Sequence, residues 1–459
     1  MDYAALEQFI FQQMAQFNTA GVSIALIEGD DISWTRGFGL RDVDQGLFAT
    51  PNTLYPVASV TKSFTAAAIM QLAEAGKLSV EEPVETYLPW FTLRPGGESI
   101  RIRHLLTHTS GMAALGSSER IAGNLSGARG DLLPMLTYAD LPLFLRDAQS
   151  WTFGKPGERY MYSNEGYMLL GAIIQQVTNQ AHEAVIRERI LQPLGMARAF
   201  FSRTDVEADA EVSALYQLTA EGKRLALRSP FRDLNGHSGL VTNVLDLTRY
   251  VRMYMCGGEF AGARVLQPES VSEMTTPRTY TSMRGENGRQ SQYGYGLLVV
   301  EDFFDDTLIG HGGSIGIATS FIGYLKNHNV GVAVLMNGTG TPAEFIGMVA
   351  LAMLAGQDPY QLPFVKQESY YAPLAGVYRT YMNTVEARVR RLADFLTITF
   401  TYDDYRTVTT ALAPDVVGAD YCRFYTSAFG QRLNVEFFTR PNGQVELVYE
   451  RYLLKKAGA

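Results

Sequence analysis

Cysteine is scarce in this chain, whose 459 residues include only Cys256 and Cys422, far apart in the sequence. We therefore expect no framework of structural disulfides, and both thiols should be buried among their apolar and aromatic neighbours. The six histidines occur without a CxxC or HExxH spacing. Because zinc sites need such closely spaced ligands, we expect no metal site, and no cofactor is indicated.

Basic clusters and long apolar runs are missing as well. The formal net charge is -8, and the short basic stretch from Arg388 to Arg391 suits a solvated strand or turn. A nucleic-acid partner is excluded, because phosphates require a concentrated basic surface. No window approaches the roughly 18 apolar residues of a membrane span. Residues 1–7 carry acid and are followed by no apolar region, so we expect no export signal and a cytoplasmic protein.

What remains is the composition of an ordinary globular protein, 46% hydrophobic and 19% charged. A single core rarely grows beyond about 250 to 300 residues, which predicts two domains. After Gly356 the pattern changes to short alternating strands separated by turns. We expect a first domain over residues 1–357, a linker over 358–370 and a small all-β barrel over 371–459. The strands expected in the barrel are 375–381, 395–402, 421–426, 433–439 and 445–454.

The pattern of the first domain predicts an α+β fold. Apolar spacing indicates a helix over residues 3–17, followed by a hairpin of strands at 21–27 and 31–39. An unbroken apolar helix over 59–76 leads into a mainly helical stretch that extends to residue 230. Both ends of the domain should share one antiparallel sheet with helices on both faces and a helical subdomain inserted between them. The later elements are strands at 295–301, 318–325 and 330–337 and a helix at 343–355.

Ser59 and Lys62 stand three residues apart at the start of the apolar helix. This spacing puts both side chains on one helix face, within reach of each other. A serine hydroxyl becomes a nucleophile when a base takes its proton, and burial lowers the pKa of a lysine so that it can be that base. The N–H of Ser59, at the helix start, is free to join an oxyanion hole. The alternative is a surface N-cap serine beside a solvated lysine.

Tyr162 and Asn164 immediately precede a second apolar helix, expected over residues 164–179. The tyrosine can shuttle a proton between nucleophile and leaving group if the nearby Lys62 depresses its pKa. Asn164 can donate a hydrogen bond to a substrate amide carbonyl. The structural alternative is an aromatic plug followed by an asparagine N-cap.

A third group, His311-Gly312-Gly313-Ser314, is expected to lead into a strand. Its glycines would let a substrate backbone lie against the strand edge, and the following N–H could be a second oxyanion donor. The stretch 312–316 also matches GxSxG, which would make Ser314 the nucleophile of an α/β-hydrolase. That fold requires an acid and then a histidine further along, and the only later histidine, His328, falls in an expected hairpin turn. The order therefore argues against this reading.

Together, SxxK, YxN and HGG in this order resemble the serine β-lactamase and penicillin-binding-protein family, which includes class C β-lactamases, D-aminopeptidases and esterases of peptidase family S12. Other segments are similar to further sequence motifs of the same family. The resemblance covers roughly residues 5–355. These further segments are Leu105–Met112, similar to LLxHTSG, Phe153–Gly157, similar to FxPG, and Gly239-Leu240 with Asp246-Leu247, similar to GGL..DL.

The resemblance implies that Ser59 is the nucleophile, that Lys62 and Tyr162 are the base and acid, and that Asn164 is a substrate ligand. His311 stands where the β-lactamases have a lysine that offers a fixed cation to a carboxylate. Histidine is mostly neutral at pH 7, so efficient β-lactam hydrolysis is disfavoured.

The same resemblance places Gly313 against the substrate and forms the oxyanion hole from the N–H groups of Ser59 and Ser314. The HxG triplet is similar to that of D-aminopeptidase-like members. Leu374–Tyr378 resembles the opening LxGxY strand of a lipocalin-like C-terminal domain attached to some members. Such a barrel would cap the hydrolase, narrow its entrance or mediate a homo-oligomer.

The expected function is that of a serine hydrolase that forms an acyl-enzyme at Ser59 on a small-molecule or peptide substrate. Short peptides, amides and esters are expected, including those with a D-configured residue. Three alternatives stay open: an acyltransferase or peptide cyclase of the penicillin-binding-protein-type thioesterase kind, with a carrier protein as partner; a β-lactamase; and a non-catalytic binding protein.

Overall fold

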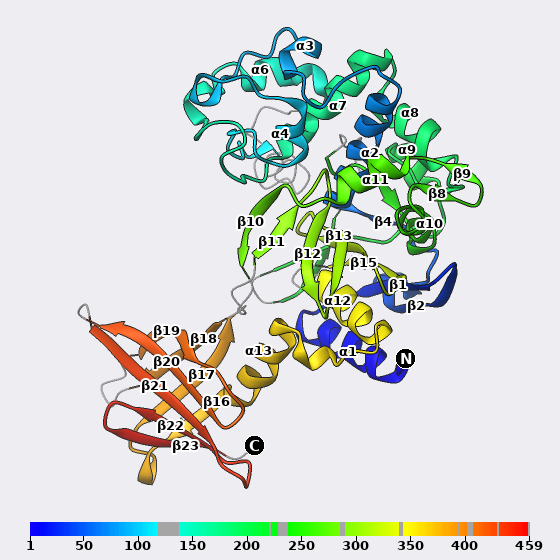
Figure 1. Cartoon of the computed structure of the whole chain (residues 1–459). Helices are drawn as coiled ribbons and strands as arrows, with labels where there is room; N and C mark the ends of the chain where they lie inside the picture. The colour runs from blue at the N-terminus through cyan, green and yellow to red at the C-terminus, as the bar shows by residue number, and fades with distance from the viewer. Residues whose placement is uncertain are drawn as a thin grey trace. The chain divides into compact units, whose positions relative to one another are not determined.

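The computed structural model describes residues 1–117, 137–219, 222–227, 237–284, 290–338, 343–392, 395–401, 407–428 and 431–457. The chain forms two compact units, Met1–Gln357 and Asp358–Ala459 (Figure 1). Each unit has its own hydrophobic core. None of the helices in the described ranges is both long enough and apolar enough to cross a bilayer.

A nine-stranded antiparallel sheet is the centre of the first unit. Strand β1, from the beginning of the chain, pairs with β15, from the end of the unit, with Gly21 opposite Asn337. The two ends of the unit therefore share one sheet, as the sequence pattern predicts. In spatial order the strands are β10 (Thr279–Arg284), β11 (Gln290–Tyr293), β12 (Leu298–Phe303), β13 (Asp306–Ser314), β14 (Ala318–Leu325), β15 (Val330–Asn337), β1 (Gly21–Glu28), β2 (Asp31–Asp42) and β3 (Leu47–Phe48).

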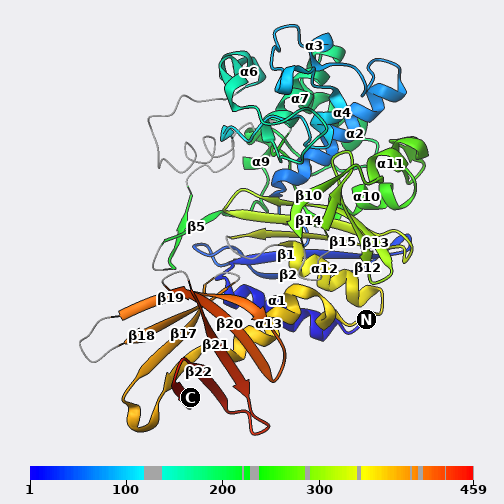
Figure 2. The ribbon, with the colours of Figure 1, turned by 60° about the vertical axis from the view of Figure 1, so that its left-hand side comes forward.

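Helices cover both faces of this sheet (Figure 2). On one face, α10 (Val244–Met255) packs on β15, where a Cβ added at Gly331 would lie 3.0 Å from Val251. On the other face, α12 (Ala343–Leu354) packs on β14 with α1 (Tyr3–Gln16) beside it. Because successive residues of a strand point to opposite faces, covering both faces requires apolar side chains at nearly every position. The central strands β1, β14 and β15 are accordingly buried almost throughout.

The helical subdomain is built on α2 (Thr61–Glu74), which is buried from Thr61 to Leu72 and packs against α7 (Asn164–Thr178). Burial on all sides explains why α2 has no polar face in the sequence. The other α-helices of the unit in the described ranges are α3 (Val84–Tyr87), α4 (Ile102–Leu106), α6 (Leu141–Leu145), α8 (His182–Ile186), α9 (Arg203–Glu207) and α11 (Pro268–Thr275). The remaining short strands are β4 (Tyr55–Pro56), β5 (Tyr216–Leu218), β6 (Arg224–Ala226), β7 (Val241–Thr242), β8 (Glu259–Phe260) and β9 (Ala263–Arg264).

Two details of the first unit correct the sequence predictions. The strand predicted from residue 295 begins at Leu298, because Gly296, at φ +75, turns the chain over α2, where an added Cβ would meet Ala66. The prediction of a buried thiol is right for Cys422 and wrong for Cys256. Cys256 is exposed because it is the C-cap residue of α10, where the helix ends at the surface.

The second unit contains a closed barrel of eight antiparallel strands in which each strand pairs with the next and β23 pairs with β16. The small all-β barrel is confirmed, although the sequence pattern indicates only five strands. The strands are β16 (Gly376–Arg379), β17 (Glu386–Leu392), β18 (Phe395–Thr401), β19 (Thr407–Val416), β20 (Tyr421–Ala428), β21 (Gln431–Thr439), β22 (Val445–Tyr449) and β23 (Tyr452–Lys456). Most of the segment expected as a linker is helix α13 (Pro363–Tyr371).

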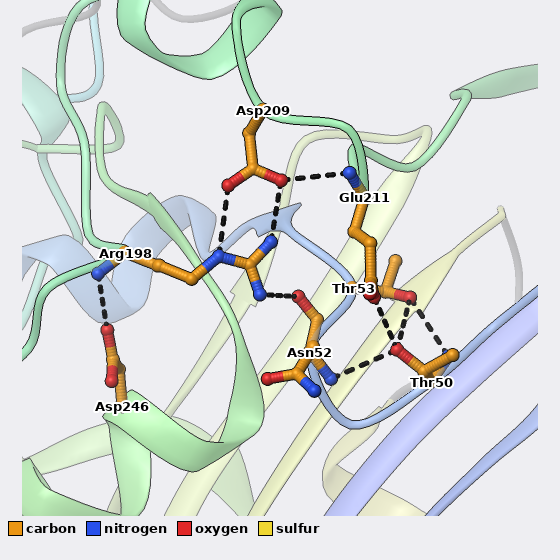
Figure 3. A network of polar contacts seen from close by, with 7 residues as sticks. All are labelled: Thr50, Asn52, Thr53, Arg198, Asp209, Glu211 and Asp246. Carbon is orange, nitrogen blue, oxygen red and sulfur yellow. Dashed lines mark hydrogen bonds and ion pairs between the residues drawn. The ribbon is translucent and has the colours of Figure 1, made fainter.

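A polar network ties the segment before the SxxK helix to the rest of the unit (Figure 3). Arg198 donates from Nε and Nη2 to the carboxylate of Asp209, at 2.9 and 2.6 Å, and from Nη1 to the backbone oxygen of Asn52 at 2.8 Å. Its backbone N–H donates to Asp246 Oδ2 at 2.8 Å, in the first turn of α10. One arginine thus joins three segments that are distant in the sequence.

Replacing Arg198 by methionine should lower the free energy of unfolding of the first unit by about 1–3 kcal/mol. The reason is that the side chain of Asp209, only 15% exposed, would lose its bidentate partner. The measurement is urea unfolding followed by tryptophan fluorescence, since all three tryptophans lie in this unit. Arg146→Met is the control, because the side chains of Arg146 and Asp147 are 68% and 85% exposed and such pairs contribute little. Equal losses in both variants would contradict the prediction.

Candidate active site

Ser59 lies in a short 3-10 turn, Ala58–Val60, that runs directly into α2. The residue before it, Ala58, has φ +48, in the left-handed region that a side chain makes costly by about 1–3 kcal/mol. Strained backbone of this kind concentrates at functional sites. Ser59 itself is half-buried and lines a cavity.

Lys62 follows one turn later on the same helix face and is fully buried. Its Nζ lies 3.0 Å from Ser59 Oγ, 2.7 Å from Asn164 Oδ1 and 3.0 Å from the backbone oxygen of His237. Burial lowers the pKa of Lys62 to about 7, and the charge of Glu165 partly opposes this shift. A lysine that is neutral near pH 7 can accept the proton of a neighbouring hydroxyl. The alternative of a solvated lysine is therefore wrong.

Tyr162 makes a hydrogen bond with Ser59, and the Nζ of Lys62 lies 4.9 Å from the centroid of its ring. The condition set for proton shuttling, that Lys62 depresses the pKa of Tyr162, is not met. Burial raises this pKa, and the hydrogen bond with Ser59 offsets only part of the shift. Tyr162 therefore keeps its O–H at neutral pH, which suits a proton donor better than a base.

His108 holds Tyr162 in place. Its ring packs on the tyrosine ring with centroids 4.2 Å apart, and its Nδ1 accepts from the backbone N–H of Ser163 at 3.1 Å. The proton of the neutral imidazole must then be on Nε2, which is buried without a hydrogen-bond partner among the described residues. Burial lowers the pKa of His108, with smaller effects from Lys62 and His311. His108 is thus a neutral positioning residue, and no motif around Tyr162 indicates it.

Glu165, the residue after Asn164, is the second functional residue that the sequence interpretation missed. Its buried carboxylate accepts from the N–H groups of Leu115 and Ser117 at 3.2 and 3.1 Å and from the hydroxyl of Ser163 at 3.0 Å. It therefore fixes the start of α7 and places a negative charge near Lys62. An acid in the first turn of a helix is a common capping pattern, so the sequence does not distinguish this role.

The sequence pattern predicts that the HGG triplet precedes a strand. In the structure the triplet lies inside strand β13. A Cβ added at Gly313 would lie 3.0 Å from the backbone nitrogen of Ser59, so only glycine allows the strand to approach so closely. Among the described strands, β12 pairs with β13 only as far as Gly310, and β14 continues to pair with His311 through Ser314. The other edge of residues 311–314 therefore has no partner strand among those that the structure describes.

His311 is a neutral residue in this arrangement. Its Nδ1 lies 2.6 Å from the backbone oxygen of Gly312, and its Nε2 lies 2.8 Å from the hydroxyl of Tyr293. Because a carbonyl oxygen only accepts, Nδ1 carries the proton and Nε2 accepts from the tyrosine. Burial and the charge of Lys62 lower the pKa of His311 to about 4. The expectation that this position offers no fixed cation at pH 7 is supported.

A cavity of about 520 Å³ joins these residues. Five of the seven predicted site residues line it, and the other two, Lys62 and Asn164, connect to Ser59 through the hydrogen bonds of Lys62. The lining residues that the sequence did not indicate come from segments far apart in the chain, so no local motif could mark them. In the described ranges the lining consists of Ser59, Tyr160, Tyr162, Tyr293, Leu298, His311, Gly312, Gly313, Ser314, Thr319, Ser320, Ala343 and Glu344.

A family model described as Beta-lactamase matches residues 6–357, which include the whole of this site. The chain belongs to the beta-lactamase family. The resemblance drawn from the motifs is therefore confirmed, and members of the beta-lactamase family are serine hydrolases. A second model, described as Pab87 octamerisation domain, matches residues 359–455, which contain the barrel.

Solved relatives share this architecture. The octameric penicillin-binding protein homologue from Pyrococcus abyssi is 38% identical, with a TM-score of 0.93 over 99% of this chain and 100% of that one. A D-stereospecific amidohydrolase from Streptomyces sp. shares the fold at 23% identity, with a TM-score of 0.62 over 78% of this chain and 100% of that one.

Protein flp of Staphylococcus aureus strain N315 is 27% identical over 339 residues, 72% of this chain. The present chain spans 62% of the length of protein flp.

Proposed function

We propose that this beta-lactamase-family protein is a serine hydrolase that forms an acyl-enzyme at Ser59. Its substrates are short peptides, amides or esters, including those with a D-configured residue on the acyl side. The observation that carries the proposal is the 3.0 Å contact between Lys62 Nζ and Ser59 Oγ, made by a buried lysine whose pKa is about 7. This contact gives the hydroxyl the base without which it is a poor nucleophile.

In the acylation step, neutral Lys62 takes the proton of Ser59 while Oγ bonds to the carbonyl carbon of the substrate. The N–H groups of Ser59 and Ser314 stabilise the resulting oxyanion. Tyr162 then protonates the leaving amine or alcohol, the bond to the leaving group breaks, and Lys62 returns a proton to Tyr162. A water molecule hydrolyses the acyl-enzyme in the second half-reaction and releases the acid.

The remaining site residues orient the substrate in this scheme. The Oδ1 of Asn164 is taken by Lys62, so its Nδ2 is the group that would donate to a substrate amide carbonyl. Gly313 faces the acyl group along the free edge of β13. The fold shared with a D-stereospecific amidohydrolase supports amides as substrates.

We infer that the second unit mediates assembly into a homo-oligomer, whereas residues 1–357 carry the chemistry. The support is the octamerisation description of the matching family and the octameric state named for the Pyrococcus abyssi homologue, which is 38% identical. Size-exclusion chromatography with light scattering tests this inference. A full chain that elutes as a monomer would contradict it.

Two alternatives use the same nucleophile. An acyltransferase or cyclase would pass the acyl group to an amine instead of water. A β-lactamase is disfavoured because the lining residues that the structure describes include neither lysine nor arginine and His311 is neutral, so none of them offers a cation to a β-lactam carboxylate.

The test is a panel of D- and L-amino-acid amides, p-nitrophenyl esters and a chromogenic cephalosporin, with products identified by mass spectrometry. We expect free acid from an amide or ester, and turnover of the cephalosporin about 100-fold slower or less. Products joined to an added amine would replace hydrolysis by acyl transfer. No turnover, together with no covalent labelling by a fluorophosphonate, would overturn the proposal in favour of a non-catalytic binding protein.

A further inference from the structure

The cavity around Ser59 has few ionisable side chains among its described lining residues. Among its thirteen lining residues in the described ranges there is no lysine or arginine, His311 is neutral, and Glu344 is the one carboxyl group. The rest of the lining is aromatic, apolar or hydroxylic. Among the described lining residues, Glu344 is therefore the one that can offer a negative charge to a substrate.

Glu344 reaches the cavity from the first turn of α12. Its carboxylate lies close to the HGG strand, since a Cβ added at Gly312 would be 3.0 Å from Glu344 Oε2. The side chain is only half-exposed, and burial raises its pKa. It forms no hydrogen bond or ion pair with any other residue in the described ranges.

A first-turn acid also interacts favourably with the helix dipole, and that is the ordinary reason for finding one there. The dipole does not require burial, however, as the exposed Glu269 in the first turn of α11 illustrates. A partly desolvated carboxylate without a counter-ion is costly unless a ligand supplies the opposite charge. Glu344 therefore lies where a cationic group of the substrate would compensate for its burial.

We propose that Glu344 binds the free α-ammonium group of the substrate and so selects amino-acid amides, and peptides with an unblocked N-terminus, over N-acylated or carboxylate-bearing compounds. The inference rests on the proposed function and narrows it, because it fixes the charge of one group of the substrate. An ammonium group can pair with Glu344, a neutral acetamide cannot, and a carboxylate is repelled.

The test compares Glu344→Gln, which keeps the shape and removes the charge, with the wild type on three kinds of reporter. These are D- and L-alanine p-nitroanilide, their N-acetyl derivatives and p-nitrophenyl acetate. For the wild type we expect at least one free-amine enantiomer to have a kcat/KM about tenfold or more above that of its acetylated form. Glu344→Gln should lower that kcat/KM by about 10- to 100-fold and leave the N-acetyl compounds and the ester within about twofold.

Glu269→Gln is the matched control, because it neutralises a first-turn acid that lies outside the cavity, and it should change none of the rates. The rate of labelling by a fluorophosphonate checks that the Glu344→Gln site is intact. If the ester is hydrolysed but the free and acetylated amines react equally in both proteins, or neither amine reacts, the role of Glu344 is overturned and the hydrolase proposal stands. If the ester is not hydrolysed and Ser59 is not labelled, the proposed function itself fails.

Discussion

Ser59→Ala should abolish covalent labelling by a fluorophosphonate and lower kcat on the best amide or ester by about 10³-fold or more. The variant lacks the only atom that can form the acyl bond in the proposed reaction, and Lys62 Nζ loses the hydroxyl that lies 3.0 Å away. Because Ser59 is half-buried at a helix start and the substitution is small, the fold should be kept. Intact-protein mass spectrometry measures the adduct, and stopped assays measure kcat.

Ser314→Ala is the matched control for this experiment. Ser314 lines the same cavity and is the serine of the GxSxG match at residues 312–316. Its hydroxyl only accepts a hydrogen bond from the N–H of Gly316, at 3.3 Å, so the variant should keep the label and most of the activity. An adduct that survives in Ser59→Ala and disappears in Ser314→Ala would reverse the assignment.

Local spacing was sufficient to predict the part of the site that one helix builds. Ser59 and Lys62 share a helix face because residues three apart do so in any α-helix, and the apolar sequence that follows requires this helix to be buried. Burial in turn lowers the pKa of the lysine. The fold class and the central strands were predictable for a related reason, since β15 is an almost continuous apolar run and both β14 and β15 are bounded by turn residues.

The features that the sequence did not indicate depend on contacts between distant segments. Gly312 and Gly313 suggest a loop, and only their pairing with β14 places them inside a strand. Glu344 belongs to no motif, and His108, although it is part of the LLxHTSG-like segment, gains its role from the segments against which it packs. The sequence also did not indicate that burial raises the pKa of Tyr162, an effect that its hydrogen bond with Ser59 offsets only in part.

In the barrel, the sequence pattern also failed to indicate a turn between two strands. The predicted strand over 445–454 is two strands, β22 and β23, joined through Glu450, which has φ +51. Turns that need this conformation are usually marked by glycine or asparagine, and neither is present here. Strand β17 is absent from the strands expected in the barrel, although the basic stretch within it was interpreted as a solvated strand or turn. In β17 the exposed Arg388 and Arg390 alternate with the buried Ala387 and Val389.

Lys62→Met should lower kcat/KM by about 10³-fold, because the variant has no base within reach of Ser59 Oγ. In the wild type, kcat/KM should rise with pH through about 7, the pKa of Lys62, since only the neutral amine accepts a proton. The residual activity of Lys62→Met should lack this rise. The measurement is the pH profile of kcat/KM from pH 5 to 9 for both proteins, and a rise at the same pH in the variant would exclude Lys62 as the base.

Stability measurements separate this chemical role from a structural one. The folded pKa of Lys62, about 7, is below the value of 10.5 for a solvated lysine, so between these pH values the unfolded chain binds more protons. The contribution of Lys62 to the free energy of unfolding should therefore rise with pH across this window, by at most about 1.4 kcal/mol per unit. Lys62→Met should lack this slope and be at least as stable as the wild type at pH 7, whereas the exposed control Lys77→Met should keep the slope and the activity. If Lys62→Met were much less stable than the wild type at pH 7, the buried lysine would serve the protein through the hydrogen bonds of its charged amine and not as a base.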